Sequence, residues 1–127
     1  MVEPDYAPYE KEISGLHEMQ EVVGGSIQAI YPYKEQVAIV CNEEGILNDL
    51  PFNRSIEGGY GGVFGTFFVC GLGEESFCSL TPEQVKTYKQ KFHHAEILIG
   101  ARGNEVVTLR VEPREKNKPP KGHDRPT

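Results

Sequence analysis

Four glutamates stand in two adjacent pairs, a pattern that can serve acid–base chemistry or cation binding. The pairs are Glu43–Glu44 and Glu74–Glu75, and a glycine adjoins each of them. Paired carboxylates can act as a general acid and base, or can hold a hard cation. Sequence neighbours on a turn usually diverge into water, however. We therefore expect these four glutamates to contact a basic partner protein rather than to be catalytic or to bind a metal.

Arg54 is the second candidate, because it is the only base between Lys34 and Lys86. An arginine in an acidic stretch is expected to pair with a carboxylate, and Glu43 or Glu44 would be close enough along the chain. In the alternative interpretation, Asn53 and Arg54 present their donors to an anionic ligand. Both interpretations remain open on the sequence alone.

A glycine-rich segment, 58–65, follows this pair, and the amides of Gly59 and Gly61 are further candidates for ligand binding. The segment lacks the Gly-Lys-Ser/Thr ending of a P-loop, and it precedes a strand instead of opening a helix. Nucleotide binding here is accordingly the weaker alternative. The pattern favours a flexible loop over residues 55–62.

Three cysteines, Cys41, Cys70 and Cys78, show no Cys-x-x-Cys spacing, and no histidine stands at metal-site spacing from them. Neither a metal nor another cofactor is expected. Cys41 and Cys70 lie in apolar runs, where a thiol acts as a small hydrophobic group. Cys78 precedes a predicted helix, which can activate a thiol, but the nearby acidic residues oppose this. We expect a protein that is not an enzyme.

Charge is divided unevenly along the 127 residues, whose net charge is −6. Residues 1–82 hold 13 acids and three bases, a net of −10, whereas residues 113–127 hold five bases and two acids. An acidic body repels phosphate backbones, so direct nucleic-acid binding by the folded part is not expected. The acidic surface is either simply solvated or a face that docks a basic protein.

Length and composition place the chain among folded globular proteins. We expect a single domain over residues 1–112 and a disordered basic tail over 113–127, which lacks anchoring apolar residues. The longest apolar stretch, 63–72, is about half a membrane span, so no membrane association is expected. No export signal precedes the first predicted element, which predicts a cytoplasmic protein. The oligomeric state is left open.

Two helices are predicted. The first spans about 15–23, with Ser14 as N-cap and a glycine at its end. The second runs from Pro82 to about Phe92 and begins with the strongest local signal in the chain. Thr81 and Gln84 form a capping box there, and Pro82 occupies the first helical position.

Strands are predicted at six places, and residues 1–8 are expected to form a loose arm. A short strand is expected at 9–13, and a hairpin joins 26–31 to 37–41, whose unbroken apolar run indicates a central strand. A further strand spans 63–70, and a second hairpin joins 96–99 to 105–111, turning at Gly103 or Asn104. These elements predict an α+β fold with one mainly antiparallel sheet of about five strands and two short helices.

Several motif blocks resemble an uncharacterised family, the domain of unknown function 3846. The resemblance covers about residues 9–92, with its blocks in the expected order, and departs from the pattern at 55–62. The blocks are Leu16–Gln20, Val23–Tyr31, Ile39–Gly45, then Leu47, Leu50, Pro51, Asn53 and Arg54, then Gly65–Gly71, and finally Phe77 and Ser79–Thr81.

This resemblance implies a setting, but no activity, cofactor or catalytic residue. The family is common in Firmicutes, their phages and their integrative mobile elements. The motif residues are mostly turn-formers: Gly24, Gly25, Asn42, Glu44, Gly45, Asn53 and Arg54. We therefore expect a small accessory protein of a phage or mobile element that binds a basic host or element protein.

Overall fold

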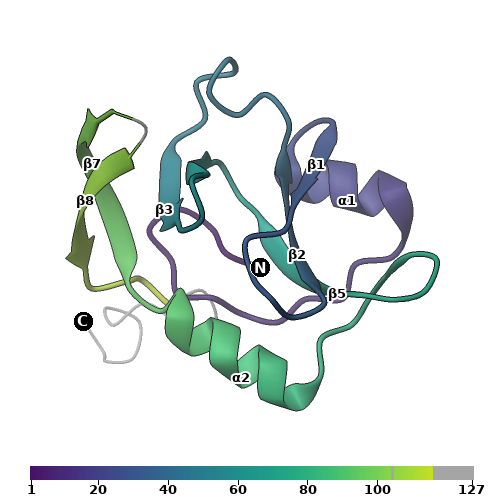
Figure 1. Ribbon diagram of the computed structural model, residues 1–127. Helices are drawn as coiled ribbons and strands as arrows, with labels where there is room; N and C mark the ends of the chain where they lie inside the picture. The colour runs from purple at the N-terminus through teal and green to yellow at the C-terminus, as the bar shows by residue number, and fades with distance from the viewer. Residues whose placement is uncertain (104, 116–127) are drawn as a thin grey trace, which may run out of the picture.

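The computed structural model describes residues 1–103 and 105–115 (Figure 1). Two helices and eight strands follow one another along the chain. They are α1 Gly15–Val23, β1 Ile27–Ile30, β2 Val37–Asn42, β3 Phe52–Ile56, β4 Gly61–Phe64, β5 Phe68–Leu72, β6 Phe77–Cys78, α2 Pro82–Lys91, β7 Ala95–Arg102 and β8 Glu105–Val111. The α+β class, the two helices and the antiparallel pairing are confirmed.

The strands form three separate antiparallel sheets, so the expectation of one sheet of about five strands is corrected. The largest sheet has the order β1-β2-β5-β6, while β3 pairs with β4 and β7 with β8. The predicted single strand 63–70 is divided between two sheets. Gly65, at φ 92°, follows the last residue of β4, which pairs with β3. The chain then passes into β5, which pairs with β2 in the four-stranded sheet.

β2 is central, as its apolar run predicts, because both of its faces are covered. All six of its residues are buried. Val37, Ile39 and Cys41 belong to a core cluster that includes Tyr88 of α2, whereas Val40 belongs to a second cluster beneath α1. Burial on two faces accounts for the continuous hydrophobic pattern of this strand.

The first residues are part of the fold, so the prediction of a loose arm over 1–8 is wrong. Val2 is buried, and its backbone exchanges hydrogen bonds of 2.8 and 3.0 Å with Phe67. Arg114, placed by the sequence in the basic tail, pairs through its backbone with Asp5 and Ala7 at 2.8 and 2.7 Å. The remainder of the predicted tail, 116–127, lies outside the described residues.

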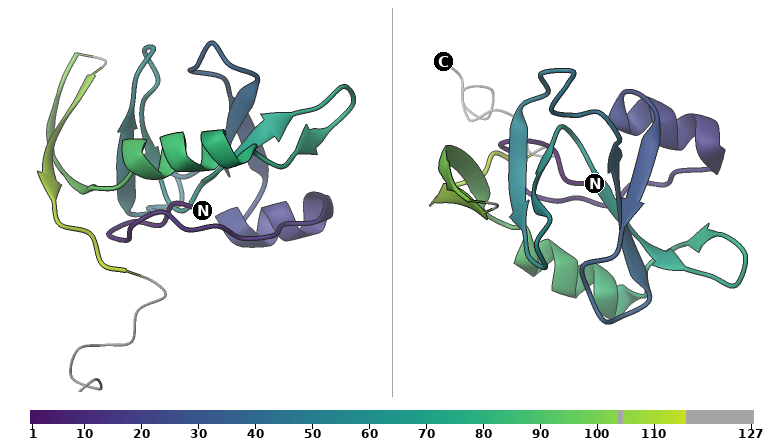
Figure 2. Two further views of the ribbon diagram at one scale, coloured as in Figure 1. Left: turned by 90° about the horizontal axis from the view of Figure 1, so that it is seen from below. Right: turned by 45° about the horizontal axis from the view of Figure 1, so that its top comes forward.

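Other local expectations are corrected by longer-range pairing. Residues 9–13 form no strand; they are an extended segment that crosses the molecule beneath the sheet (Figure 2). Half of the flexible loop predicted at 55–62 is sheet, since β3 continues to Ile56 and β4 begins at Gly61. Only residues 57–60 turn between these two strands.

Candidate functional site

Asn53 and Arg54 lie at the centre of the molecule and are fully buried. Arg54 Nε and Nη2 donate to the carbonyl of Phe92 at 3.2 and 2.9 Å, and Nη2 also donates to the carbonyl of Tyr6 at 2.7 Å. Its Nη1 donates to Asn53, to the carbonyl and to Oδ1. All five N–H groups of the guanidinium are therefore used within the protein.

Asn53 completes the same network. Its Nδ2 donates to the carbonyls of Val2 and Gly65, both at 2.9 Å. The pair thus ties together the first residues, the end of β4 and the end of α2. The expectation that Asn53 and Arg54 offer donors to a ligand is wrong, because no donor of either side chain faces solvent.

The alternative pairing of Arg54 with Glu43 or Glu44 is also corrected, because its acceptors are backbone carbonyls and the side-chain oxygen of Asn53. Burial lowers the pKa of Arg54 to about 10, and the charges of Glu96 and Asp5 oppose that shift. The side chain is therefore charged at neutral pH.

Gly59 lies exposed in the β3–β4 turn and Gly61 opens β4, so the glycine amides form a hairpin and not an anion cradle.

Glu43 and Glu44 lie on a compact turn between β2 and β3. The turn is held by its own hydrogen bonds, including Glu44 N–H to Asn42 Oδ1 at 2.7 Å and Leu50 N–H to the Gly45 carbonyl at 3.0 Å. Gly45 does not adopt a positive φ. It is required because a Cβ there would lie 2.5 Å from the Phe64 carbonyl oxygen.

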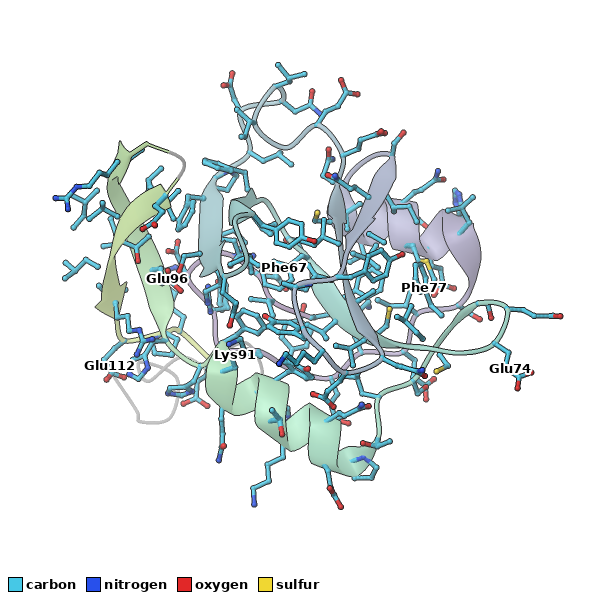
Figure 3. All side chains as sticks on the ribbon, in the orientation of Figure 1. Phe67, Glu74, Phe77, Lys91, Glu96 and Glu112 are labelled. Atoms are coloured by element: carbon cyan, nitrogen blue, oxygen red, sulfur yellow. The ribbon has the colours of Figure 1, made fainter. Side chains whose placement is uncertain are left out.

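Glu74 and Glu75 occupy a different turn, between β5 and β6, and both are exposed. Figure 3 shows Glu74 at the outer end of this hairpin, whereas the turn of Glu43 and Glu44 lies at the top of the same view. The two turns are also apart in Figure 2. The structure therefore does not unite the four predicted partner-binding glutamates in one cluster.

Part of the acidic charge of residues 1–82 is compensated by α2. Lys89 pairs with Glu10 at 3.3 Å, and Lys91 pairs with Glu57. The acidic surface is therefore less uniform than the sequence suggests. Glu12, which is exposed and has no ion-pairing partner among the described residues, keeps its charge uncompensated.

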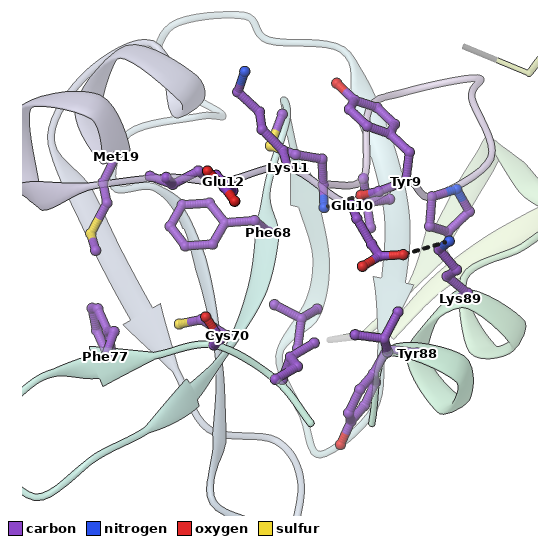
Figure 4. Close-up of a pocket in the computed structure, with 18 of the residues that line it drawn as sticks. Tyr9, Glu10, Lys11, Glu12, Met19, Phe68, Cys70, Phe77, Tyr88 and Lys89 are labelled. Atoms are coloured by element: carbon purple, nitrogen blue, oxygen red, sulfur yellow. Dashed lines mark hydrogen bonds and ion pairs between the residues drawn. The ribbon is translucent and has the colours of Figure 1, made fainter. Parts of the chain in front are cut away.

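A groove of about 790 Å³ lies between the extended segment 8–14, the β5–β6 hairpin and α2. Phe68 and Cys70 of β5, Phe77 of β6 and Met19 of α1 supply its apolar lining (Figure 4). Burial raises the pKa of the Cys70 thiol to about 11, so this group is neutral and behaves as part of the apolar lining.

The rim of the groove is charged and carries unused backbone groups. Glu10, Lys11 and Glu12 come from the extended segment, and Glu10 reaches Lys89 of α2 across the groove (Figure 4). Within the described chain, the backbone of residues 10–13 makes no hydrogen bond. The groove thus combines apolar side chains, carboxylates and a free length of extended backbone.

Sequence reasoning missed this groove, because its lining comes from four separated segments. The one available signal was the alternation of Tyr9, Lys11 and Ile13 with Glu10 and Glu12, which indicates extended backbone. That backbone is present, but no strand of the described residues pairs with it.

No cluster of three or more His, Cys, Asp or Glu side chains suited to a metal occurs among residues 1–103 and 105–115. No helix in this described part is both long and apolar enough to cross a bilayer. Cys78, the candidate nucleophile, lies exposed on β6, and Glu43 and Glu44 project from their turn.

The described residues form a small α+β fold with a groove beside residues 8–14. The chain belongs to the family described as Domain of unknown function (DUF3846), whose model matches residues 1–93. The matched region contains the whole Asn53–Arg54 network, from Val2 to Phe92, and ends before β7. No curated protein and no solved structure matches the chain.

Proposed function

We propose that this protein acts without catalysis, by binding an extended basic and apolar segment of a partner protein in the groove beside residues 8–14. The observation that carries the proposal is the groove itself, where unpaired backbone lies next to an apolar floor and a carboxylate rim.

The backbone of residues 10–13 supplies the first recognition element. An extended segment offers alternating donors and acceptors, and a partner strand that pairs with it gains main-chain hydrogen bonds. Successive side chains of a paired strand point to opposite faces. Alternate partner residues would thus enter the groove toward Phe68, Cys70 and Phe77, while the others face the rim.

Charge supplies the second element. Glu12 and Glu18 line the groove together with the ion pair of Glu10 and Lys89, and residues 1–82 as a whole carry a net of −10. A partner with lysine or arginine at its outward positions would be steered to this surface.

The resemblance that first linked the chain to phages and mobile elements suggests the setting of this binding. In our proposal the protein works in the cytoplasm as an accessory protein of such an element. Its partner is a basic protein of the host or the element, for example a defence or DNA-processing factor. Binding would block or redirect that factor.

A small-ligand function based on Asn53, Arg54 and the glycine-rich turn is not favoured, because the donors of the pair are fully used inside the protein. The groove has a volume in the range of small-molecule sites. Its open backbone, however, suits an extended peptide better than a compact ligand.

Mapping of amide shifts by NMR tests the proposal, with a peptide of alternating lysine and valine about ten residues long as the probe. We expect shift changes concentrated in residues 9–14 and in β5 and β6, with affinity falling as salt rises. Changes centred on the turn of Glu43 and Glu44, or no saturable change at all, would contradict it. A lysine–serine peptide serves as the control and should bind more weakly, because it lacks apolar side chains.

A further inference from the structure

The β7–β8 hairpin has two faces of different character. On the inner face, Glu96 Oε1 accepts hydrogen bonds from Ser55 N–H and Oγ–H of β3 at 3.1 and 2.7 Å. Thr108 Oγ1 donates to the same oxygen at 2.9 Å. The hairpin is therefore fixed to the body by a polar contact on this face.

The outer face is apolar and open. Ile97 lies directly opposite Leu109, and Val107 is opposite Gly100, while Ile99 occupies the register shift between Leu98 and Gly100. The exposed fractions are 49% for Ile97, 63% for Ile99, 41% for Val107 and 54% for Leu109. The four side chains expose on the order of 400 Å², the size of the largest apolar patch on an ordinary monomer.

Two further observations concern this hairpin. Its two strands pair only with each other in the described chain, and a two-stranded sheet without a covering layer has little stability of its own. The hairpin also lies outside residues 1–93, the part that matches the family. Figures 1 and 2 show it at one edge of the molecule, beyond β3 and away from α1.

We propose that the outer face of the β7–β8 hairpin is a self-association surface, which packs against the same face of a second copy of this chain. Two apolar sheet faces stacked about 10 Å apart would bury these side chains in a small sandwich core.

Charge favours a second copy over a basic partner at this surface. Residues 95–112 hold three acids and two bases, whereas residues 1–82 hold 13 acids and three bases. At the tip of the outer face, Arg102 lies opposite Glu105, so the face carries no net charge there. Two such faces can pack together without repulsion between like charges. Two copies of the acidic body, by contrast, would repel each other.

The size of the patch sets the strength of the contact. Stable interfaces bury about 800 Å² on each partner, and this patch offers about half of that area. We therefore expect a weak dimer that forms with increasing protein concentration, not a permanent one. The contact is independent of the groove, so its failure would leave the proposed function unaffected.

Sedimentation velocity over about a hundredfold range of concentration tests the inference. The mass of the wild-type chain should rise from 14.2 kDa toward twice that value. Leu109→Lys should remain monomeric at every concentration. The control, Leu47→Lys, makes the same charge change on the turn of Glu43 and Glu44, where Leu47 is 78% exposed, and should associate like the wild type.

Three results would overturn the inference: a wild-type chain that stays monomeric throughout, a Leu109→Lys variant that still dimerises, or a Leu47→Lys variant that also loses association. Should Leu109→Lys unfold, as circular dichroism would reveal, Ile99→Lys repeats the test at the more exposed bulge position.

Discussion

At the residue scale, Asn53 and Arg54 are the organising pair of this protein. The guanidinium is buried without a carboxylate in contact and is satisfied by carbonyls that lie 48 and 38 positions away along the chain. A buried charge is tolerated when every donor is matched. Local sequence suggested a nearby glutamate instead, because a pattern of residue types contains no information about distant backbone oxygens.

Replacing the guanidinium should be costly. Arg54→Met removes the donors to the buried carbonyl of Phe92 and to the buried Oδ1 of Asn53, and we expect a loss of ~3 kcal/mol in the free energy of unfolding. Urea denaturation measures this loss. Arg102→Met, on the exposed tip of the β7–β8 hairpin, is the matched control and should change stability little. Equal losses of stability in the two variants would contradict a stabilising role for the Arg54 network.

At the scale of elements, the local signals were the reliable ones. The capping box that predicts α2 is present, with Thr81 N–H donating to Gln84 Oε1 at 3.0 Å and Gln84 N–H donating to Thr81 Oγ1 at 3.1 Å. By contrast, the predicted strand 63–70 became two strands in different sheets. The turn at Gly65 is fixed by contact with Leu50, 2.7 Å from where a Cβ would lie, and sequence periodicity cannot reveal that contact.

The capping box makes a measurable prediction. Thr81→Ala removes the side-chain acceptor for the Gln84 amide and should lower the free energy of unfolding by about 1 kcal/mol. Thr87→Ala, within the same helix, is the control. Its hydroxyl donates only to the Glu83 carbonyl on an exposed face, so thermal unfolding of this variant should match the wild type or exceed it. A reversed order of the two variants would rule out capping as the cause.

The contact between α2 and the β3–β4 turn should depend on pH. Partial burial favours a raised pKa for Glu57, but the hydrogen bond and charge of Lys91 outweigh it, and the pKa lies below its ordinary value of 4.5. A carboxyl group with a depressed pKa contributes stability that is present above 4.5 and is lost as the pH falls through the folded-state value.

The wild type should therefore lose stability below pH 4.5 more steeply than Lys91→Gln does. Denaturant midpoints measured over the acid range provide the comparison. Lys86→Gln, which removes a lysine of α2 that makes no ion pair in the described chain, should retain the wild-type slope. Identical slopes for wild type and Lys91→Gln would exclude Glu57 as a contributor.

At the scale of the whole molecule, the sequence predicted an acidic character but not its arrangement. The four glutamates singled out by adjacency lie on two separate turns, and two other acids are neutralised by α2. The groove arises only when the first residues, β5, β6 and α2 come together. Its lining residues are scattered along the chain, so their types and spacing carry no signature of the site.

The most direct test of groove binding compares charge reversals at two exposed glutamates by calorimetry, with the alternating lysine–valine peptide as the ligand. Glu12→Lys, on the groove rim, should weaken binding by about fivefold or more, whereas Glu43→Lys, on the distant turn, should change it less than about twofold. Equal losses in both variants would mean that the peptide senses only the overall charge. A larger loss from Glu43→Lys would place binding on the other turn, and either result would contradict a partner site in the groove.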